Sequence, residues 1–368
     1  MDFKVYTLLI FISAFIAGYY LTPKIRKLML SKNLAAEPNN RSSHETPTAN
    51  LGGIAFYVIL MISFYFISPY DPNNIAISLI PGLTILFIVG LKDDLLVLGP
   101  LTKLLAQLIA VVLFVVHYGL EISTLNGFMG IDDLNPLIGG AIAVFIIVAI
   151  INALNLIDGI DGLAATVSII MFSAFGYVFY TIESYFLFLL SVVMIGTLLA
   201  YLRFNLSSTK KIFMGDTGSM ILGFILGVMA VSFLAIAPND LSQLPIRGEN
   251  LPIVTGAILV IPFFDTVRVF IVRVYERKNP FKPDRSHIHH IIIDKFKISH
   301  RRASFVLGVS NFLIIIFISY LGVTTNNWIL LAFFSGLLVI LSVFFFVINK
   351  SSWFLKKKKK TAMQKKSD

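Results

Sequence analysis

The sequence contains no cysteine among its 368 residues, so disulfides and thiolate metal sites are excluded. Charged side chains are also scarce. Asp, Glu, Lys and Arg make up 14% of the chain, whereas 57% of the residues are hydrophobic and the mean hydropathy is +0.85. A water-facing surface cannot be built from so few charged residues. The composition therefore excludes an ordinary soluble protein and favours one that lies mostly in a membrane.

Apolar runs of roughly 17 to 22 residues recur along the chain, each long enough to cross a hydrocarbon core of about 30 Å. The first run lacks the basic flank and the small-residue cleavage site of a signal peptide, so we expect a membrane helix there too. The predicted fold is an all-α transmembrane bundle: one membrane-embedded domain over residues 1–349, then a basic, disordered cytoplasmic tail over 350–368. The eleven predicted spans are 4–21, 52–69, 75–91, 103–118, 136–153, 163–181, 185–201, 218–237, 252–272, 303–322 and 327–348.

The positive charge is unevenly distributed over the loops. Of the 30 Lys and Arg residues, all but Lys4 and Arg247 lie in the connections after odd-numbered spans, at their borders or in the tail. The positive-inside rule therefore predicts an outer N-terminus and a cytoplasmic C-terminus. The run Lys356–Lys360 suits anionic lipid head groups, although a solvated tail would look the same.

The distinctive polar residues concentrate on this same cytoplasmic side. A membrane protein without a localised function would scatter them over all its loops. Here an independent topology prediction and an independent motif search agree on one face of the bilayer. The five clusters fall at residues 41–53, 92–103, 152–162, 203–219 and 282–290.

Asp93 and Asp94 lie where the third span should end. Two adjacent carboxylates repel each other unless a cation or a shared proton holds them. The pair therefore indicates a divalent metal or a site of phosphate chemistry. The alternative is a plain pair of charges at a helix end.

Residues 152–162 place an amide or carboxylate side chain at every third position, directly after a long apolar run. At this spacing the side chains share one helix face. They suit the imide and hydroxyl groups of a nucleotide sugar, and the carboxylates can also hold a metal. Interhelical hydrogen bonding is the alternative interpretation. The residues are Asn152, Asn155, Asp158 and Asp161, with Gly159 and Gly162 between and after the carboxylates.

Two further clusters suit phosphate. The segment 213–219 opens the eighth span, and a helix N-terminus attracts anions, although Asp216 could be a simple N-cap and Phe213 a packing residue rather than a platform for a flat base. The loop 281–290 carries Arg285, His287, His289 and His290. Three histidines can bind zinc, but the adjacent basic residues favour a cationic, hydrogen-bonding clamp for a pyrophosphate.

Taken together, the motifs resemble those of the polyprenyl-phosphate N-acetylhexosamine-1-phosphate transferases, over nearly the whole chain. The resemblance implies that undecaprenyl phosphate, or another polyprenyl phosphate, attacks the sugar-proximal phosphate of a UDP-sugar and releases UMP, with Mg²⁺ or Mn²⁺ required. The motifs are Asp93-Asp94, Asn152-x-x-Asn155-x-x-Asp158-Gly159-x-Asp161-Gly162, Met214-Gly215-Asp216-x-Gly218-Ser219 and Asp284-Arg285-x-His287-x-His289-His290.

The histidine motif is similar to that of the branch that uses UDP-N-acetylglucosamine to start O-antigen, enterobacterial common antigen or teichoic acid chains. The branch that makes peptidoglycan precursors, which is the alternative, has three consecutive histidines, and Ile288 interrupts such a run here. Asn50-Leu51 departs from the family, where a basic residue often precedes Gly52-Gly53. A transporter is the rival from another class, because intramembrane Asn and Asp also occur in substrate pathways.

The resemblance also implies roles for single residues, at an active site on the cytoplasmic face of a bacterial inner membrane. Direct attack by the lipid phosphate is favoured over a phospho-aspartate, because a phosphate monoester is already largely dianionic near neutral pH. Nucleic acid is not an expected partner, and a homodimer is a further prediction. Asp93, Asp94 and Asp216 would be catalytic, with Asp216 the first metal ligand and Asp93 and Asp94 further candidates; Lys103 would contact phosphate; Asn152, Asn155, Asp158, Asp161, Asn205 and Phe213 would hold uridine or sugar; Arg285, His287, His289 and His290 would hold the diphosphate.

Overall fold

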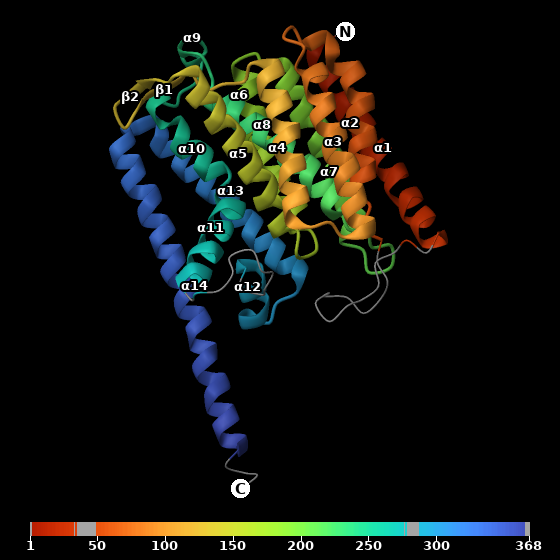
Figure 1. Cartoon of the computed structure of the whole chain (residues 1–368). Helices are drawn as coiled ribbons and strands as arrows, with labels where there is room; N and C mark the ends of the chain where they lie inside the picture. Colours follow the sequence, from red (N-terminus) through yellow and green to blue (C-terminus); the bar gives the residue numbers. More distant parts are fainter. Residues whose placement is uncertain (1, 33, 35–48, 276, 278–286, 365–368) are drawn as a thin grey trace.

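The computed structural model describes residues 2–32, 34, 49–275, 277 and 287–364, with side chains through residue 348. The fold is almost entirely helical, which confirms the predicted all-α membrane bundle (Figure 1). In the described part of the chain, ten helices are long and apolar enough to cross a membrane. They are α1 (Phe3–Ser31), α2 (Gly53–Ile67, continued by the 3-10 turn η1, Ser68–Tyr70), α3 (Ile75–Leu96), α4 (Pro100–Tyr118), α5 (Pro136–Ile157), α6 (Leu163–Thr181), α7 (Tyr185–Asn205), α8 (Gly215–Leu234), α13 (His300–Thr324) and α14 (Asn327–Gln364).

The predicted single span at 252–272 is instead two helices, α10 (Leu251–Ile258) and α11 (Val260–Tyr275). Pro262 has no N–H to donate to the carbonyl of Ile258, four residues earlier, so the helix breaks there. The side-chain amide of Asn311, on α13, donates to that carbonyl at 3.5 Å instead. The pair still runs from one end of the bundle toward the other, and the two chain termini lie at opposite ends (Figure 1).

Short elements that the hydropathy pattern does not predict lie at both ends of the bundle. An antiparallel hairpin of β1 (Thr124–Phe128) and β2 (Ile131–Asp133) lies near α9 (Pro238–Leu241) at the end that carries the N-terminus, and the turn η2 (Gly248–Asn250) packs on β1. At the opposite end lies α12 (Ile288–Phe296), which leads into α13. These elements close the ends of the bundle rather than cross it.

The helix α8 forms the centre of the bundle and is almost wholly buried, whereas the part of α14 with described side chains is mostly exposed. Small residues on α8 allow the neighbouring helices to approach it closely. Gly223 and Gly227 of α8 face Ile151 and Ile147 of α5, with no room for a side chain at either glycine. The first turn of α8 is therefore held inside the bundle, at the end where α12 lies.

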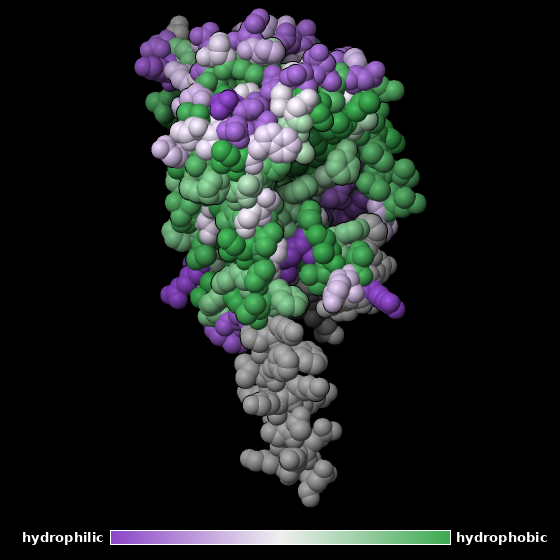
Figure 2. All heavy atoms as spheres, turned by 90° about the vertical axis from the view of Figure 1, so that its left-hand side faces the viewer, coloured by the Kyte–Doolittle hydropathy of each residue, from purple (hydrophilic) through white to green (hydrophobic). Residues whose placement is uncertain are grey.

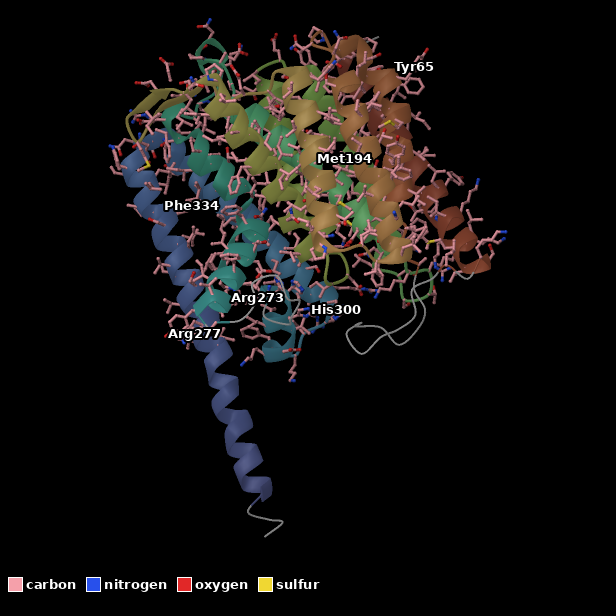
Figure 3. All side chains as sticks on the ribbon, in the orientation of Figure 1. Tyr65, Met194, Arg273, Arg277, His300 and Phe334 are labelled. Carbon is pink, nitrogen blue, oxygen red and sulfur yellow. The ribbon has the colours of Figure 1, made fainter. Side chains whose placement is uncertain are left out.

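The surface agrees with a membrane environment. On the face shown in Figure 2, hydrophobic residues form a broad belt beneath a hydrophilic end, and hydrophilic residues reappear in a hollow of the belt and at its lower edge. Figure 3 places Arg273, Arg277 and His300 at the end opposite Tyr65. Helix α14 continues to Gln364, past residue 349, where the sequence predicts that the membrane domain ends and a disordered tail begins. The domain boundary and the orientation in the membrane stay predictions.

The orientation can be tested with single cysteines, since the natural chain has none to interfere. Ser208 and Ser242 are both exposed, in the connection from α7 to α8 and after α9 respectively. We expect a membrane-impermeant maleimide to label Ser242→Cys in intact cells and Ser208→Cys only after the cells are lysed. The reverse order would contradict the predicted orientation, and the cysteine-free parent controls for background labelling.

Candidate active site

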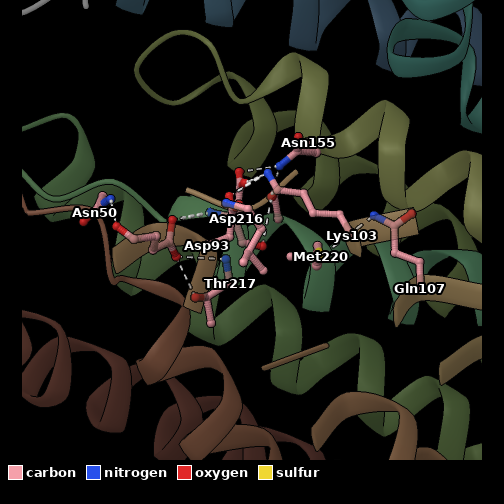
Figure 4. A network of polar contacts seen from close by, with 11 residues as sticks. Asn50, Asp93, Lys103, Gln107, Asn155, Asp216, Thr217 and Met220 are labelled. Atoms are coloured by element: carbon pink, nitrogen blue, oxygen red, sulfur yellow. Dashed lines mark hydrogen bonds and ion pairs between the residues drawn. The ribbon is translucent and has the colours of Figure 1, made fainter. Parts of the chain in front are cut away.

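The first turn of α8 is capped by a carboxylate from another helix. Met214, at the N-cap position, makes no side-chain cap. Asp94 of α3 replaces it: one carboxylate oxygen accepts from the Asp216 N–H at 2.8 Å, and the other accepts from the Thr217 N–H and hydroxyl at 3.0 and 2.6 Å (Figure 4). These N–H groups have no partner within a helix, and a negative charge there is favoured by the helix dipole. Asp94 therefore fixes α8 against α3.

Glycines make this contact close enough. A Cβ atom on Gly90 of α3 would lie 2.5 Å from the Cα of Thr217, and one on Gly53 of α2 would overlap Gly218. Gly215 has a φ of +69° and lies against the carbonyl of Asn50 and the carboxylate of Asp94. The segment before α2 also pairs with the segment before α8, since the Gly52 N–H donates to the Phe213 carbonyl at 2.9 Å. Helices α2 and α3 thus position the start of α8 directly.

Lys103 of α4 joins two of the predicted catalytic carboxylates. Its ammonium group lies 2.6 Å from Asp93 and also contacts Asp216. The other oxygen of Asp93 accepts from the Leu98 N–H at 2.5 Å, where α3 ends with Val97 at a positive φ. Asn155 of α5 donates to the carboxylate oxygen of Asp216 that Lys103 does not contact, at 2.6 Å, and to the Ser219 hydroxyl at 2.9 Å. Four helices therefore meet around Asp216 (Figure 4).

Asn152, one turn earlier on α5, faces a different partner. Its amide donates to the side-chain oxygen of Gln107 at 2.7 Å and to the Val148 carbonyl at 2.8 Å. Gln107 lies one turn after Lys103 on α4 and is 2% exposed. A buried amide without a partner would be costly. This pair therefore connects α4 to α5 beside the carboxylate cluster, and the amide hydrogens of Asn152 are already used within the protein.

The link from α5 to α6 carries Asp158 and Asp161, and their environments differ. Asp161 lies 2.5 Å from the ammonium of Lys211 and 3.6 Å from His300 Nδ1. Burial raises its pKa, but His300 and Lys211 outweigh that effect, so the pKa of Asp161 is lowered from its ordinary value. In the described part of the chain Asp158 makes no hydrogen bond, and burial together with repulsion from Asp216, Asp94 and Asp161 raises its pKa well above the ordinary value.

Asn205 and Phe213, predicted to bind uridine or sugar, lie near Asp161. Asn205 is buried, with its oxygen accepting from the Gly162 N–H at 2.6 Å and its amide donating to Tyr201 and to the Ile212 carbonyl at 2.8 and 2.9 Å. It connects the end of α7 to two loops of the site. Phe213 is partly exposed, and the Lys211 ammonium lies 5.3 Å from its ring centroid. Phe213 is thus available to a ligand, whereas Asn205 positions the loops around it.

The histidine segment meets the same region through His289. This ring is 1% exposed, and a Cβ on Gly159 would lie 2.6 Å from its Nε2. Its ring centroid lies 4.3 Å from that of His290 and 5.7 Å from that of His287. Burial, with a smaller contribution from His290, lowers the pKa of His289 to about 3, so the ring is neutral at neutral pH. His289 can therefore offer a hydrogen bond but no charge. Arg285 lies outside the described residues.

The residues around Asp216 fit a divalent cation only in combination with substrate. Among the described residues, no group of three His, Asp or Glu side chains is arranged to hold a metal. Mg²⁺ is commonly held by one or two carboxylates together with substrate phosphates, which requires no such cage. The Lys103 ammonium between Asp93 and Asp216 shows that these two carboxylates accept a shared cation. Asp216 and Asp93 therefore fit Mg²⁺, whereas both oxygens of Asp94 cap α8.

Sequence reasoning missed three residues of this site. Lys211 was one of many loop cations, Gln107 a lone amide in the fourth span, and Asp265 a lone carboxylate in the ninth. Asp265 of α11 is fully buried and bonds His287. A signal was present for two of them, since a polar side chain within a membrane span is costly and usually serves the site. For Lys211 only the fold reveals the partner.

The comparisons with known proteins agree with the motifs. Residues 76–234, from the start of α3 to the end of α8, match the model of glycosyl transferase family 4. The chain is 28% identical over 308 residues to the probable undecaprenyl-phosphate N-acetylglucosaminyl 1-phosphate transferase of Bacillus subtilis, covering 82% of this chain and 81% of that protein. It is 29% identical over 321 residues to the decaprenyl-phosphate N-acetylglucosaminephosphotransferase of Mycolicibacterium smegmatis, covering 80% and 77%. The resemblance predicted from the motifs is confirmed.

The close approach of α3 to α8 can be tested at Gly90. A methyl group there would push against Thr217, so we expect Gly90→Ala to destabilise the protein by about 1–3 kcal/mol, as overpacking in a core does. Gly99 is the matched control, because a Cβ atom at Gly99 meets nothing within 4 Å. Thermal unfolding of the two purified variants measures the difference, and equal stability would contradict the described packing.

The state of Asp158 can be tested through the pH dependence of stability. A carboxyl whose pKa is raised by folding favours the folded state most below its ordinary value of 3.8, and this contribution is lost as the pH rises through the folded value. Asp158→Asn cannot ionise. We therefore expect the variant to be more stable than the parent above neutral pH, with the difference shrinking toward pH 4. Thermal unfolding of the parent and the variant across this pH range measures the difference, with the exposed Asp240→Asn as control. If folding did not shift the pKa of Asp158, the plots of melting temperature against pH would be parallel.

Proposed function

We propose that this protein transfers N-acetylglucosamine-1-phosphate from a UDP-sugar to a polyprenyl phosphate and releases UMP. The match of residues 76–234 to the model of glycosyl transferase family 4 supports this reaction class. The observation that carries the proposal is the cluster at the start of α8. Asp93, Lys103, Asn155 and Asp216 come from four helices and meet at one end of a membrane bundle. A lipid phosphate and a water-soluble nucleotide can both reach such an end. The printed names of the relatives supply the sugar and the class of lipid.

The reaction needs two anionic substrates to come together. An oxygen of the lipid phosphate forms a bond to the sugar-proximal phosphorus, and the bond from that phosphorus to the bridging oxygen breaks. The UMP leaves with the electron pair. Catalysis of this kind consists mostly of positioning and charge stabilisation. Lys103 would supply positive charge for a phosphate here, because the first N–H groups of α8 are already taken by Asp94.

A divalent cation would be held by Asp216, with Asp93 as the second carboxylate. When bound, it would neutralise phosphate charge and polarise the phosphorus–oxygen bond. Both oxygens of Asp94, the other predicted catalytic carboxylate, accept from the Asp216 and Thr217 N–H groups. It is a positioning residue for Asp216. The engagement of Asp93 and Asp216 by Lys103 favours direct attack by the lipid phosphate over a phospho-aspartate.

The donor nucleotide fits the neighbouring region, formed by Asp158, Asp161, Phe213 and His289. Phe213 offers a partly exposed ring for a flat base. Asp161 is ionised and can accept from an imide or a hydroxyl. His289 packs against Gly159 in the link that carries Asp158 and Asp161, and so supports this region from within the protein. Because basic loops flank this end of the bundle, we place it on the cytoplasmic face of a bacterial inner membrane.

The proposal is tested by measuring UMP released from radiolabelled UDP-N-acetylglucosamine in the presence of polyprenyl phosphate and Mg²⁺. Asp216→Asn removes a charge from the centre of the cluster but keeps the size of the side chain. We expect a loss in kcat of about 100-fold or more, the scale on which single electrostatic contacts act in catalysis. Asp240→Asn, at the other end of the bundle, should keep the activity of the parent.

The same assay includes a chelator. Activity of the parent should disappear with EDTA and return with added Mg²⁺, while Asp216→Asn should need a higher Mg²⁺ concentration for whatever activity remains. Full activity of Asp216→Asn would reject the metal assignment. Absence of UMP release from the parent with all components present would reject the proposed function.

A further inference from the structure

Asp265 is a fully buried carboxylate on α11, three residues after the proline that breaks the ninth span. It belongs to none of the five polar clusters in the sequence. Removing a carboxylate from water costs several kcal/mol unless hydrogen bonds and opposite charge compensate. The partners of Asp265 therefore indicate what the residue does.

Both oxygens of Asp265 serve the start of α12. One lies 2.9 Å from His287 Nδ1, and the other accepts from the Ile288 N–H at 2.9 Å. Arg268 contacts the second oxygen at 3.4 Å, one turn along α11. His287 is the N-cap residue of α12 but caps nothing with its own side chain. Asp265 thus caps α12 from outside and holds the ring of its N-cap residue.

The contact continues from His287 into the donor region. The His287 and His289 rings lie nearly parallel, 13° apart, and His289 rests on Gly159 of the link between α5 and α6. Gly159 follows Asp158 and precedes Asp161 by two residues. Neither ring nitrogen of His289 has a hydrogen-bond partner in the described part of the chain. Burying a ring whose two nitrogens make no hydrogen bond costs free energy. His289 is therefore held in place by packing against His287 and Gly159.

We infer that Asp265 is a positioning residue for the donor substrate: it holds His287 and the first turn of α12, and so keeps His289 packed against Gly159 in the link that carries Asp158 and Asp161. The inference rests on the proposed function. Asp265 is too deeply buried to touch a substrate, so α11 would affect donor binding only through α12. The competing explanation is a structural ion pair between Asp265 and Arg268 that maintains only the packing of α11.

The two explanations differ in their effect on the two substrates. Asp265→Asn keeps one acceptor oxygen but loses the second oxygen and the negative charge. It therefore cannot replace both of the charged contacts that Asp265 makes to His287 and Ile288. If Asp265 positions the histidine segment, KM for UDP-N-acetylglucosamine should rise about tenfold, the scale of one lost charged hydrogen bond. KM for polyprenyl phosphate should stay within about twofold, because Lys103 and Asp216 do not contact Asp265.

Asp71→Asn is the matched control. Asp71 is also a buried carboxylate that caps a helix, accepting from the Ile75 and Ala76 N–H groups at 2.9 and 2.7 Å, but it lies at the opposite end of the bundle. We expect a similar change in thermal stability and no change in either KM. An unchanged donor KM in Asp265→Asn, or an equal rise in both KM values, would overturn the inference.

Two further measurements keep the inference separate from the proposed function. Titration of the purified full-length protein with UDP-N-acetylglucosamine reports donor affinity without turnover, and it should weaken in Asp265→Asn even if the parent released no UMP. Asp265→Glu keeps the charge beside Arg268 but displaces the carboxylate, so it should fold and show the same selective loss. A fully normal Asp265→Glu, or failure of both variants to fold, would support the structural ion pair instead.

Discussion

The candidate site depends on the burial of the first turn of α8. A helix N-terminus carries N–H groups without partners inside the helix, and these cannot be left bare within a bundle. Asp94 supplies the missing acceptor from α3, and Gly53 and Gly90 let α2 and α3 come close enough for the contact. As a result Asp216 starts α8 in the middle of four helices. The same constraint recurs at α12, whose first N–H is satisfied by Asp265 of α11.

These two external caps show why the carboxylates of the site are not equivalent. Asp94 and Asp265 use both oxygens on backbone or side-chain donors of a neighbouring element, so they hold the architecture. Asp93 and Asp216 share the Lys103 ammonium, which a charged ligand can rearrange. Asp158 has no partner in the described chain and a strongly raised pKa. Contacts within the protein thus decrease from Asp94, through Asp93 and Asp216, to Asp158. A ligand would have to break fewer of them at each step.

Much of the fold follows from hydropathy, because membrane crossing sets a minimum length for an apolar helix. The break at Pro262 does not, since a proline within a span is compatible with a kinked single helix as well as with two helices. The outcome depends on Asn311, which comes from α13 and reaches the carbonyl of Ile258. The motifs around Asp94, Asn155 and Asp216 were predictable because helical spacing and helix ends determine where side chains point. Asn205 was assigned to substrate, whereas its atoms are used by Gly162, Tyr201 and Ile212, partners that only the folded chain brings near.

The charges of the site bear on the need for a cation. Within the described residues, five carboxylates at 93, 94, 158, 161 and 216 meet two lysines, Lys103 and Lys211. Both substrates of the proposed reaction are anions, so their arrival would add negative charge to a site that already has an excess of it. Burial raises the pKa of Asp158, and repulsion from Asp216, Asp94 and Asp161 raises it further. A proton on a carboxylate would neutralise only one charge and bind one oxygen. A divalent cation neutralises two and can join carboxylate to phosphate, which makes it the better partner once both substrates are bound.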